Sequence, residues 1–552
     1  MHIDDQTYTV EGRTYRRVLL RRSYREKGKV KSQTIANLSQ CSSEEIDAIK
    51  LALKNKKNLG SLQTLSDIQI TQDQSIGAVY LLKHLAKRIH IIQALGEDRE
   101  GKLALWQIMA RVIDQGSRLS STRLAQQHAV CDILDLESFD ENNLYENLDW
   151  LSEHQERIEN TLFEKRYTPT EVPQLYLYDV TSSYLEGEQN YFCEYGYNRD
   201  EKEGKPQMVI GLLTDQDGIP LSVEVFEGNT HDTKTVFSQI QKVSKRFGVK
   251  HVTFVGDKGM IKTAQIEDLH SGQFHYITAI TKPQIRKLLE TNVIRMSLFD
   301  QTLSEVEKGA IRYILRKNPL VAEGLEKKRG QKKQKVREEV QKENKYLLEH
   351  KRAKVKTAQG RVQKKIEQWG ISKFVRVEVQ EKTLFMVLDE EKEAELSLLD
   401  GCYVIKTDLS KEEASAQKVH ERYKDLALVE EGFRTFKTGY LEVRPVFVRK
   451  ETRTRGHVLV VMLAYLLVQE LRKCWASINL TVEEGIAELS NFIRLKIQVD
   501  QSVHYQIPHP SDLSEDLFEC VGVTPPTRIP TKHVKVTTRK SLVSERKCRR
   551  DA

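Results

Sequence analysis

The chain has 552 residues and a formal net charge of +8, from 87 Lys and Arg against 79 Asp and Glu. Hydrophobic residues make up 39% and charged residues 30%, so a buried core would lie beneath an unusually ionic surface. The 28 glycines and 12 prolines are too few for a collagen-like or Pro/Gly-rich disordered chain. This length favours three or four modules.

Features of exported and membrane proteins are absent from the sequence. The first residues have neither a basic start nor an apolar stretch, and the longest apolar run, Val458 to Val468, is too short to cross a bilayer. The run therefore predicts a core helix. The seven cysteines are scattered without any Cys-x-x-Cys, which indicates reduced thiols. We expect a cytoplasmic protein with no membrane partner.

Basic residues gather in four separate clusters. The strongest, Glu326 to Ile366, holds 16 Lys and Arg against 5 Asp and Glu, and outweighs the surplus of the whole chain. The others lie at Arg13 to Lys31, at Arg444 to Arg455 and at Arg528 to Asp551. Each alone could be a solvated helix face or a flexible tail, but together they favour a polyanion that contacts several modules.

The first 170 residues change pattern once. Residues 1–42 alternate between apolar and polar around two glycine turns, which predicts a small antiparallel β unit. Residues 43–170 have the helical period, with rows such as Leu103, Trp106 and Met109, and predict a helical region, to which the resemblance described below adds a DNA-binding role.

Residues 171–282 have the pattern of an α/β layer. Strands are expected at Leu175–Val180, Met208–Thr214, Leu221–Phe226, His251–Val255 and Tyr276–Ile280. Helices are expected at Thr233–Phe247 and Lys262–His270. The order is three strands, helix, strand, helix and strand, as in an α/β fold rather than a sandwich.

The α/β pattern is then interrupted. Residues 283–400 predict an insertion domain, made of the basic helical arm and a strand pair. Residues 401–480 begin with a strand at Cys402–Lys406, become strongly helical, and predict the second part of the core. Residues 481–552 predict a C-terminal helix and a basic tail.

Three acidic residues stand out by position. Asp179 lies at the end of an apolar strand, Asp257 lies just after another, and Glu430 lies on a helix. Carboxylates at strand ends point into the crevice where α/β sheets bind ligands. Tyr423, Glu430 and Lys437 fall on one helical face. Singly, each acidic residue could equally be an ordinary turn or surface residue.

Four stretches carry a resemblance: Tyr178-Asp-Val-Thr, Gly228-Asn-Thr-His-Asp232, Gly256-Asp-Lys-Gly-Met260 and Val429-Glu-Glu-Gly-Phe-Arg-Thr-Phe-Lys437. They resemble bacterial insertion-sequence transposases of the DDE type, and among them the IS-four superfamily with its Tyr-Arg-Glu-Lys signature. Tyr423, Glu430 and Lys437 match that spacing, but Leu426 occupies the Arg position.

The resemblance implies an RNase H-like catalytic core, a mixed five-stranded sheet with helices interrupted by the insertion domain. It implies catalytic and metal-ligating roles for Asp179, Asp257 and Glu430, with two Mg²⁺ or Mn²⁺ ions, and DNA-binding roles for Tyr423, Arg434 and Lys437. The family also suggests Trp369 as a residue on which an extruded base could stack, against the simpler reading of a packing residue.

The expected function is therefore transposition: binding of double-stranded DNA at the element's inverted-repeat ends, metal-dependent cleavage, and strand transfer into target DNA by a homodimer. We expect the protein to associate with the bacterial nucleoid when it is bound to DNA. The alternatives are a catalytically decayed DNA-binding protein or another RNase H-like nuclease. The basic segment 326–366 could lie along DNA phosphates, or could be a solvated arm that pairs with a second subunit.

Overall fold

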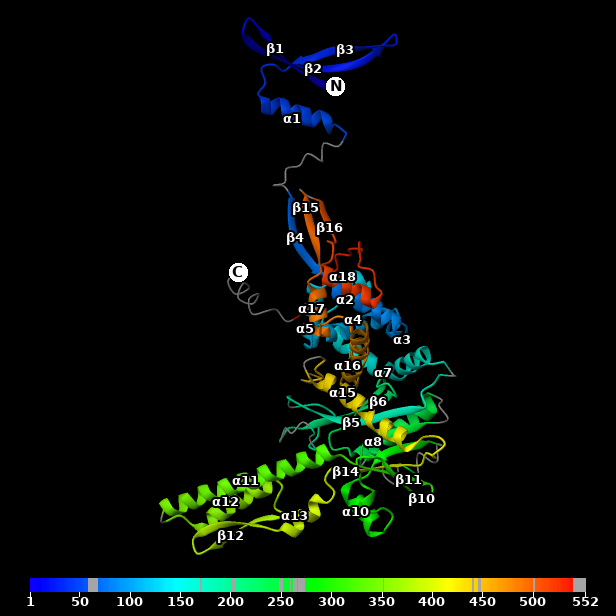
Figure 1. Ribbon diagram of the computed structural model, residues 1–552. Coiled ribbons are helices and arrows are strands. Elements are labelled where there is room, and N and C mark those ends of the chain that lie inside the picture. Colours follow the sequence, from blue (N-terminus) through cyan, green and yellow to red (C-terminus); the bar gives the residue numbers. More distant parts are fainter. Residues whose placement is uncertain are drawn as a thin grey trace. The chain divides into compact units, whose positions relative to one another are not determined.

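The computed structural model describes residues 1–57, 68–168, 171–187, 189–197, 199, 204–247, 252–258, 260–261, 266, 274–350, 352–438, 441–444, 448–499 and 502–539. The chain forms two compact units. The first contains Met1–Asp73 and Ile493–Pro508, and the second contains Gln74–Phe492 and His509–Ala552. Figure 1 labels the elements of each unit. The helix expected at Lys262–His270 lies outside the described residues, apart from Ile261 before it and Ile266 within it.

The first unit contains the antiparallel strands that the alternation predicts. Strands β1 (His2–Val10), β2 (Arg13–Glu26) and β3 (Lys29–Asn37) form a three-stranded sheet with β2 in the centre. Helix α1 (Ser43–Lys54) follows, and a capping box between Ser42 and Glu45 starts it. A second sheet of the unit joins β4 (Ile68–Ser75) to β15 (Ile493–Val499) and β16 (Ser502–Gln506). The expected boundary at residue 42 therefore does not coincide with that of the compact unit.

Helices surround a buried central helix in the second unit. They are α2 (Gly77–Arg88), α3 (Ile91–Leu95), α4 (Arg99–Ile113), α5 (Arg118–Gln127), α6 (Val130–Leu134), α7 (Glu141–Arg166), α17 (Val482–Ser490) and α18 (Asp512–Val521). The central helix is α16 (Glu451–Cys474), which contacts both α4 and α7. The helical region expected at 43–170 therefore contributes to the same core as a helix almost three hundred residues later.

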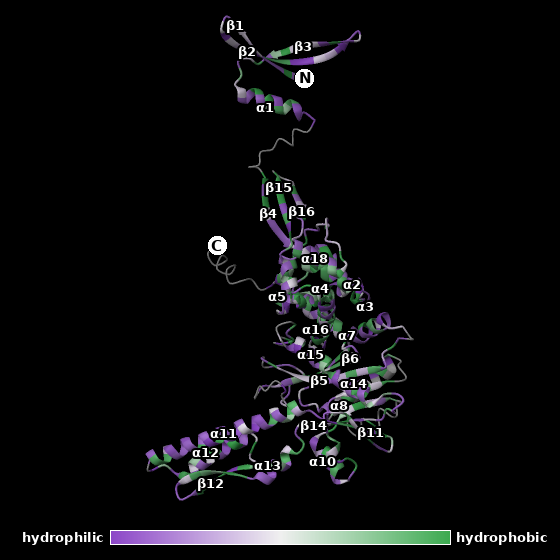
Figure 2. Cartoon of the chain, viewed as in Figure 1, coloured by the Kyte–Doolittle hydropathy of each residue, from purple (hydrophilic) through white to green (hydrophobic). Residues whose placement is uncertain are grey.

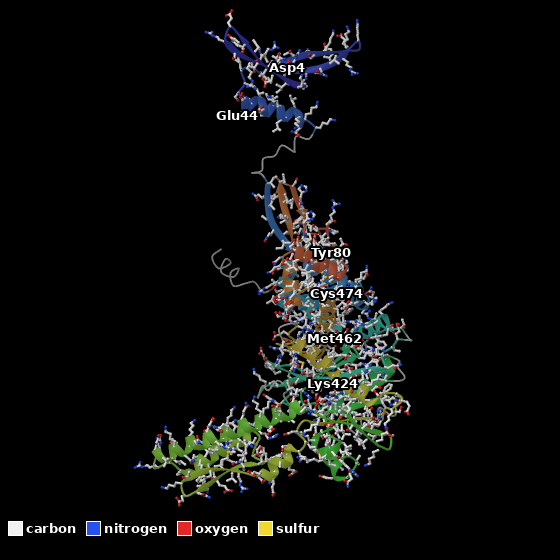
Figure 3. The ribbon with its side chains drawn as sticks, viewed as in Figure 1. Asp4, Glu44, Tyr80, Lys424, Met462 and Cys474 are labelled. Carbon is white, nitrogen blue, oxygen red and sulfur yellow. The ribbon has the colours of Figure 1, made fainter. Side chains whose placement is uncertain are left out.

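Helix α16 contains the apolar run Val458 to Val468, and every residue of that run is buried. Among the described residues it is the one helix long and apolar enough to cross a membrane, but 83% of its most apolar window is buried inside the fold. It therefore has the burial of a core helix, as the sequence predicts. Figure 2 shows its apolar residues, and Figure 3 labels Met462 and Cys474 along it.

The main sheet of the second unit is mixed. The strands β5 (Leu175–Tyr184), β6 (Gln207–Asp215) and β7 (Pro220–Glu227) form an antiparallel meander, and β8 (Thr253–Gly256) and β9 (His275–Ala279) run parallel to β5. Their spatial order is β7-β6-β5-β8-β9. The five strands expected from the sequence are thus present. Helix α8 (Asp232–Gln241) and a π-helical turn, Lys242–Arg246, follow β7.

The sheet has eight strands, not the five expected. Beyond β9 it continues through β14 (Cys402–Thr407), β11 (Ile311–Lys317) and β10 (Ser304–Lys308). The additional strands pair antiparallel, and with α10 (Lys282–Glu290) they enclose a separate apolar cluster around Tyr313 and Leu315 of β11 and Ile285 of α10. A short 3₁₀ turn, Met296–Leu298, precedes β10. Two strands that the sequence placed in the insertion therefore extend the sheet.

The remainder of the insertion has its own small core. Helices α11 (Pro319–Glu349) and α12 (Val355–Gln368) pack with the hairpin β12 (Val375–Gln380) and β13 (Thr383–Leu388), and α13 (Glu390–Ser397) follows. Val336 and Val362 are completely buried between them. Figure 2 shows how hydrophilic the exposed surface of α11 is.

Candidate active site

Asp179 lies in the middle of β5 rather than at its end. The strand continues to Tyr184, and Asp179 pairs with Leu212 of β6. Because side chains alternate along a strand, Tyr178 and Val180 point into the apolar cluster on one face, and Asp179 points to the other. Helix α15 (Leu426–Lys437) packs over β5. The sequence missed the later half of β5 because Thr181, Ser182 and Ser183 have the polarity of a loop, although all three are buried.

Asp257 follows β8 directly. In the parallel pairing of β5 with β8, Gly256 is opposite Tyr178, so Asp257 continues the chain next to Asp179. Parallel neighbours of one sheet thus place two carboxylates side by side although they are far apart in sequence. This is the arrangement expected for carboxyl ends of strands.

Glu430 comes from α15. Val429, Phe433 and Phe436 of this helix are buried, and Glu430 lies beside them on its exposed side. The single helix expected from Tyr423 to Lys437 is two helices, because Asp425 forms a turn between α14 (Ala416–Lys424) and α15. Tyr423 therefore belongs to α14, and Figure 3 labels Lys424 at the end of that helix.

The three carboxylates converge electrostatically. The pKa of Asp179 is raised to about 7, chiefly by burial and also by the negative charges of Asp257 and Glu430, although a hydrogen bond from the Val180 amide and the charge of Arg199 lower it. The Val180 amide nitrogen donates to Asp179 Oδ1 at 2.8 Å. The negative charges of Asp257 and Glu430 thus disfavour ionisation of Asp179, and a bound cation would relieve that effect.

Tyr423 holds one of these carboxylates. Its Oη donates a hydrogen bond to Asp257 Oδ1 at 3.0 Å. Burial, followed by the charge and hydrogen bond of Asp257 and the charges of Asp179 and Glu430, raises the pKa of Tyr423 strongly. The phenol is therefore neutral and acts as a donor.

The donor set fits a hard divalent cation. Mg²⁺ and Mn²⁺ prefer carboxylate oxygens, and Asp179, Asp257 and Glu430 supply them. Among the described residues, however, no three Asp, Glu, His or Cys side chains are already close enough together to hold one ion. The site therefore has the negative charge and the oxygen donors that a metal ion requires, but the described side chains are not arranged in a complete coordination geometry.

Arg199 is a site residue that the sequence pattern did not indicate. Its Nη2 donates to Asp232 Oδ1 at 2.5 Å, and its backbone amide donates to Ser182 Oγ at 2.8 Å. Its charge lowers the pKa of Asp179. The one signal in the sequence is Asp232, the last residue of the Gly228–Asp232 motif.

The other expected DNA contacts lie further along α15. Arg434 is exposed, and Lys437 is partly exposed in the last turn of the helix. Leu426, which occupies the expected Arg position, is 7% exposed and contributes to the core. Trp369 packs against the apolar cluster of the insertion, and its carbonyl accepts a hydrogen bond from Lys332 Nζ at 2.6 Å. This contact supports the packing interpretation of Trp369.

Comparison with known proteins identifies the family. Residues 171–467, more than half of the chain, match the transposase DDE domain, and residues 6–65 match the IS1634 family transposase N-terminal domain. The chain belongs to the DDE transposases of bacterial insertion sequences. A search of solved structures finds the piggyBac transposase synaptic complex with hairpin DNA, at 10% identity and a TM-score of 0.36, covering 70% of this chain and 69% of that one. No curated protein matches.

The domain match includes every residue of the carboxylate site and most of α16. In this transposase the sequence Gly456-His457, which also resembles the family, has a structural role. His457 is buried, with Arg118 Nη2 at 2.9 Å from its Nδ1 and the Val443 carbonyl at 3.0 Å from its Nε2. Burial lowers the pKa of His457 well below its ordinary value, so the ring is neutral. It fastens α16 to α5 and to the segment after α15.

Proposed function

We propose that this transposase cuts and joins DNA with divalent metal held by Asp179, Asp257 and Glu430. The observation that carries the proposal is the arrangement of the three carboxylates: the parallel register of β5 with β8 sets Asp257 beside Asp179, and α15, which carries Glu430, packs over β5. The charges of Asp257 and Glu430 both raise the pKa of Asp179. A divalent ion supplies Lewis-acid polarisation of a phosphoryl oxygen. Magnesium or manganese in a two-metal arrangement suits the donor set.

The residues of the chain have separate tasks in this proposal. Tyr423 orients Asp257 through its hydrogen bond, as outer partners of metal ligands do. Arg199, fixed by Asp232, brings a positive charge next to Asp179, where the scissile phosphate would be bound. Arg434 and Lys437 lie on the helix that carries Glu430 and are proposed to contact phosphates on either side of the cut.

The order and direction of the strands support an RNase H-like core. A three-stranded antiparallel meander followed by two strands parallel to its first member, in the order β7-β6-β5-β8-β9, is the arrangement that this proposal requires. The spacing of Tyr423, Glu430 and Lys437 supports placement in the IS-four superfamily. Leu426 departs from that signature: an apolar, buried side chain occupies the position where the signature has Arg.

The proposed partner is double-stranded DNA at the element's ends and at the target, bound by a homodimer in the cytoplasm at the nucleoid. The insertion supports a phosphate-contacting role in part. Lys328, Lys335 and Lys342, spaced seven residues apart, form a stripe along α11, turned away from Val336 and Val340. None of the three makes an ion pair within the described chain. We name them the α11 lysine stripe.

Other cations of the insertion are already used within the fold. Arg329 pairs with Asp400, and Lys333 Nζ lies 2.7 Å from Glu393 Oε1. Lys365 Nζ lies 2.5 Å from Glu339 Oε1. The surplus positive charge of the segment is therefore not uniformly available, and the α11 lysine stripe is the part best placed for DNA.

The test is charge removal at constant shape. Asp179→Asn, Asp257→Asn and Glu430→Gln should each abolish Mg²⁺-dependent cleavage of a duplex that carries the terminal repeat, while binding of that duplex persists. Glu431→Gln is a matched control, because Glu431 is the neighbouring acid of α15 and pairs with Arg472 at 3.2 Å instead. Near-normal cleavage by any of the three variants would remove that residue from the site. Binding without cleavage by the unaltered chain would instead identify a decayed DNA-binding protein.

A further inference from the structure

The N-terminal sheet has two faces of different character. Side chains alternate along a strand, and the pairing of Gln6 with Arg17 and of Tyr8 with Tyr15 fixes which of them share a face. One face of β2 carries a nearly continuous row of long polar side chains, which we name the arginine face: Arg13, Tyr15, Arg17, Arg21 and Arg25, with Gln6 and Tyr8 from β1.

Helix α1 covers the opposite face. Val18 on that face is completely buried, and Ile46 of α1 is 1% exposed. Arg16 Nη1 donates to Ser43 Oγ at 3.0 Å, and Lys50 Nζ lies 3.1 Å from Asp5 Oδ2. The helix therefore supports the sheet from behind and leaves the arginine face without cover from α1.

The side chains of the arginine face are exposed, apart from the partly buried Arg21, and some of them are prearranged. The rings of Tyr8 and Tyr15 stack with their centres 6.0 Å apart, and each side chain is about half exposed. Arg17 Nη2 donates to Gln6 Oε1 at 3.0 Å. Arg21 pairs with Asp4, whereas Arg13 and Arg25 make no ion pair within the described chain. A solvent-facing sheet surface with this excess of arginine is suited to binding a polyanion.

We infer that the arginine face enters the major groove of the terminal-repeat DNA and reads its bases. This inference rests on the proposed function and names the surface that would recognise the element's ends. Neighbouring strands lie about 4.8 Å apart, so three strands span roughly 10 Å, which suits a groove about 12 Å wide. Arginine binds guanine O6 and N7 with two hydrogen bonds, and glutamine binds adenine N6 and N7 in the same way. Sheet readers of DNA use this geometry.

The experiment compares two faces of one strand in the full-length protein. Arg13→Gln with Arg17→Gln alters the arginine face, and Arg22→Gln is the matched control, because Arg22 is exposed on the side of β2 that faces α1. The probes are a duplex with the inverted repeat that flanks the gene and a scrambled duplex of equal length. Dissociation constants are measured for both, and dimethyl sulfate protection reports guanine N7 in the major groove.

The double variant should lose about 5- to 150-fold in affinity for the terminal repeat for each lost bidentate contact, and less for the scrambled duplex. Guanine N7 protection should disappear with it. Arg22→Gln should leave the ratio of the two affinities unchanged. Arg17→Lys keeps the charge but not the paired hydrogen bonds, and should therefore lose discrimination while retaining binding to scrambled DNA.

An unchanged affinity ratio in the double variant and in Arg17→Lys would overturn the inference, and so would an equal loss in Arg22→Gln. If the unaltered protein prefers the terminal repeat and cuts it while both variants behave normally, only the arginine face is refuted. If the unaltered protein neither prefers nor cuts the terminal repeat, the proposed function fails as well.

Discussion

Replacing Tyr423 by Phe separates two roles for that residue. The family resemblance implies a DNA contact, whereas the structure places its hydroxyl on Asp257 at 3.0 Å. A hydrogen bond to a charged group contributes about 1.5–3 kcal/mol, which corresponds to roughly 10- to 150-fold in an equilibrium or rate constant. Tyr423 is only partly exposed, so most of this contribution should persist in solvent.

We expect Tyr423→Phe to need a higher Mg²⁺ concentration for cleavage and to cut about 10- to 100-fold more slowly at subsaturating Mg²⁺. Excess Mg²⁺ should restore part of the rate, and the dissociation constant for terminal-repeat DNA should hardly change. The assay is cleavage of labelled duplex across a Mg²⁺ titration, with binding measured separately in Ca²⁺.

Tyr403→Phe is the control for loss of a tyrosine hydroxyl near α14. Tyr403 lies on β14, and its Oη is 2.6 Å from Nε2 of His420 in α14. Loss of the Tyr403 hydroxyl should therefore leave the Mg²⁺ midpoint unchanged. The reasoning is refuted if Tyr423→Phe weakens DNA binding and leaves the Mg²⁺ midpoint where it was. That result would return Tyr423 to the phosphate-contacting role.

Three further outcomes are expected. Gly456→Ala should lower the free energy of unfolding by about 1–3 kcal/mol, because its Cβ would lie 2.1 Å from the Leu148 carbonyl oxygen. Gly360→Ala has open space around it and should raise the free energy of unfolding by about 0.5–1 kcal/mol. Denaturant titration measures both changes. Glutamine at all three positions of the α11 lysine stripe should weaken binding to terminal-repeat and scrambled DNA alike. The slope of log affinity against log salt should become shallower by about 0.9 for each lost phosphate contact, and an unchanged slope would mean that the stripe is only a solvated surface. Burial lowers the pKa of His128 to about 4, so protonation of this histidine favours the unfolded chain. The free energy of unfolding should therefore be highest above the unfolded-state pKa and fall as the pH drops, by about 1.4 kcal/mol near pH 5.5. In His128→Gln the melting temperature should change less between neutral and mildly acidic pH than in the unaltered protein.

The sequence by itself determined the strands and the identity of the carboxylates. The five strands from Leu175 to Ala279 follow from short apolar runs bounded by turn residues, a local signal. Asp179 and Asp257 stand out because charged residues are rare in buried strands, and Glu430 stands out because it shares a helical face with Tyr423 and Lys437. The family match at residues 171–467 confirms the transposase class that these motifs indicated.

Tertiary structure decided how far the sheet extends and where the units divide. The addition of β14, β11 and β10 to the edge strand β9 depends on pairing between segments more than a hundred residues apart. Their local alternation is the same whether they form a separate hairpin or extend the sheet. The joining of β4 to β15 across four hundred residues is equally invisible to periodicity.

The site shows the same division. Residue type and spacing indicated the acids, but only the parallel register of β5 with β8 brings Asp257 next to Asp179, and only the packing of α14 assigns Tyr423 to Asp257. Arg199, whose charge acts on Asp179, is held by Asp232 at the start of α8, and this long-range contact has no periodic signature. The sequence gives the number of basic residues, but only the fold shows which of them form ion pairs within the protein and which are left to contact DNA. Local pattern reports what each segment prefers; the partners that satisfy it depend on long-range contacts.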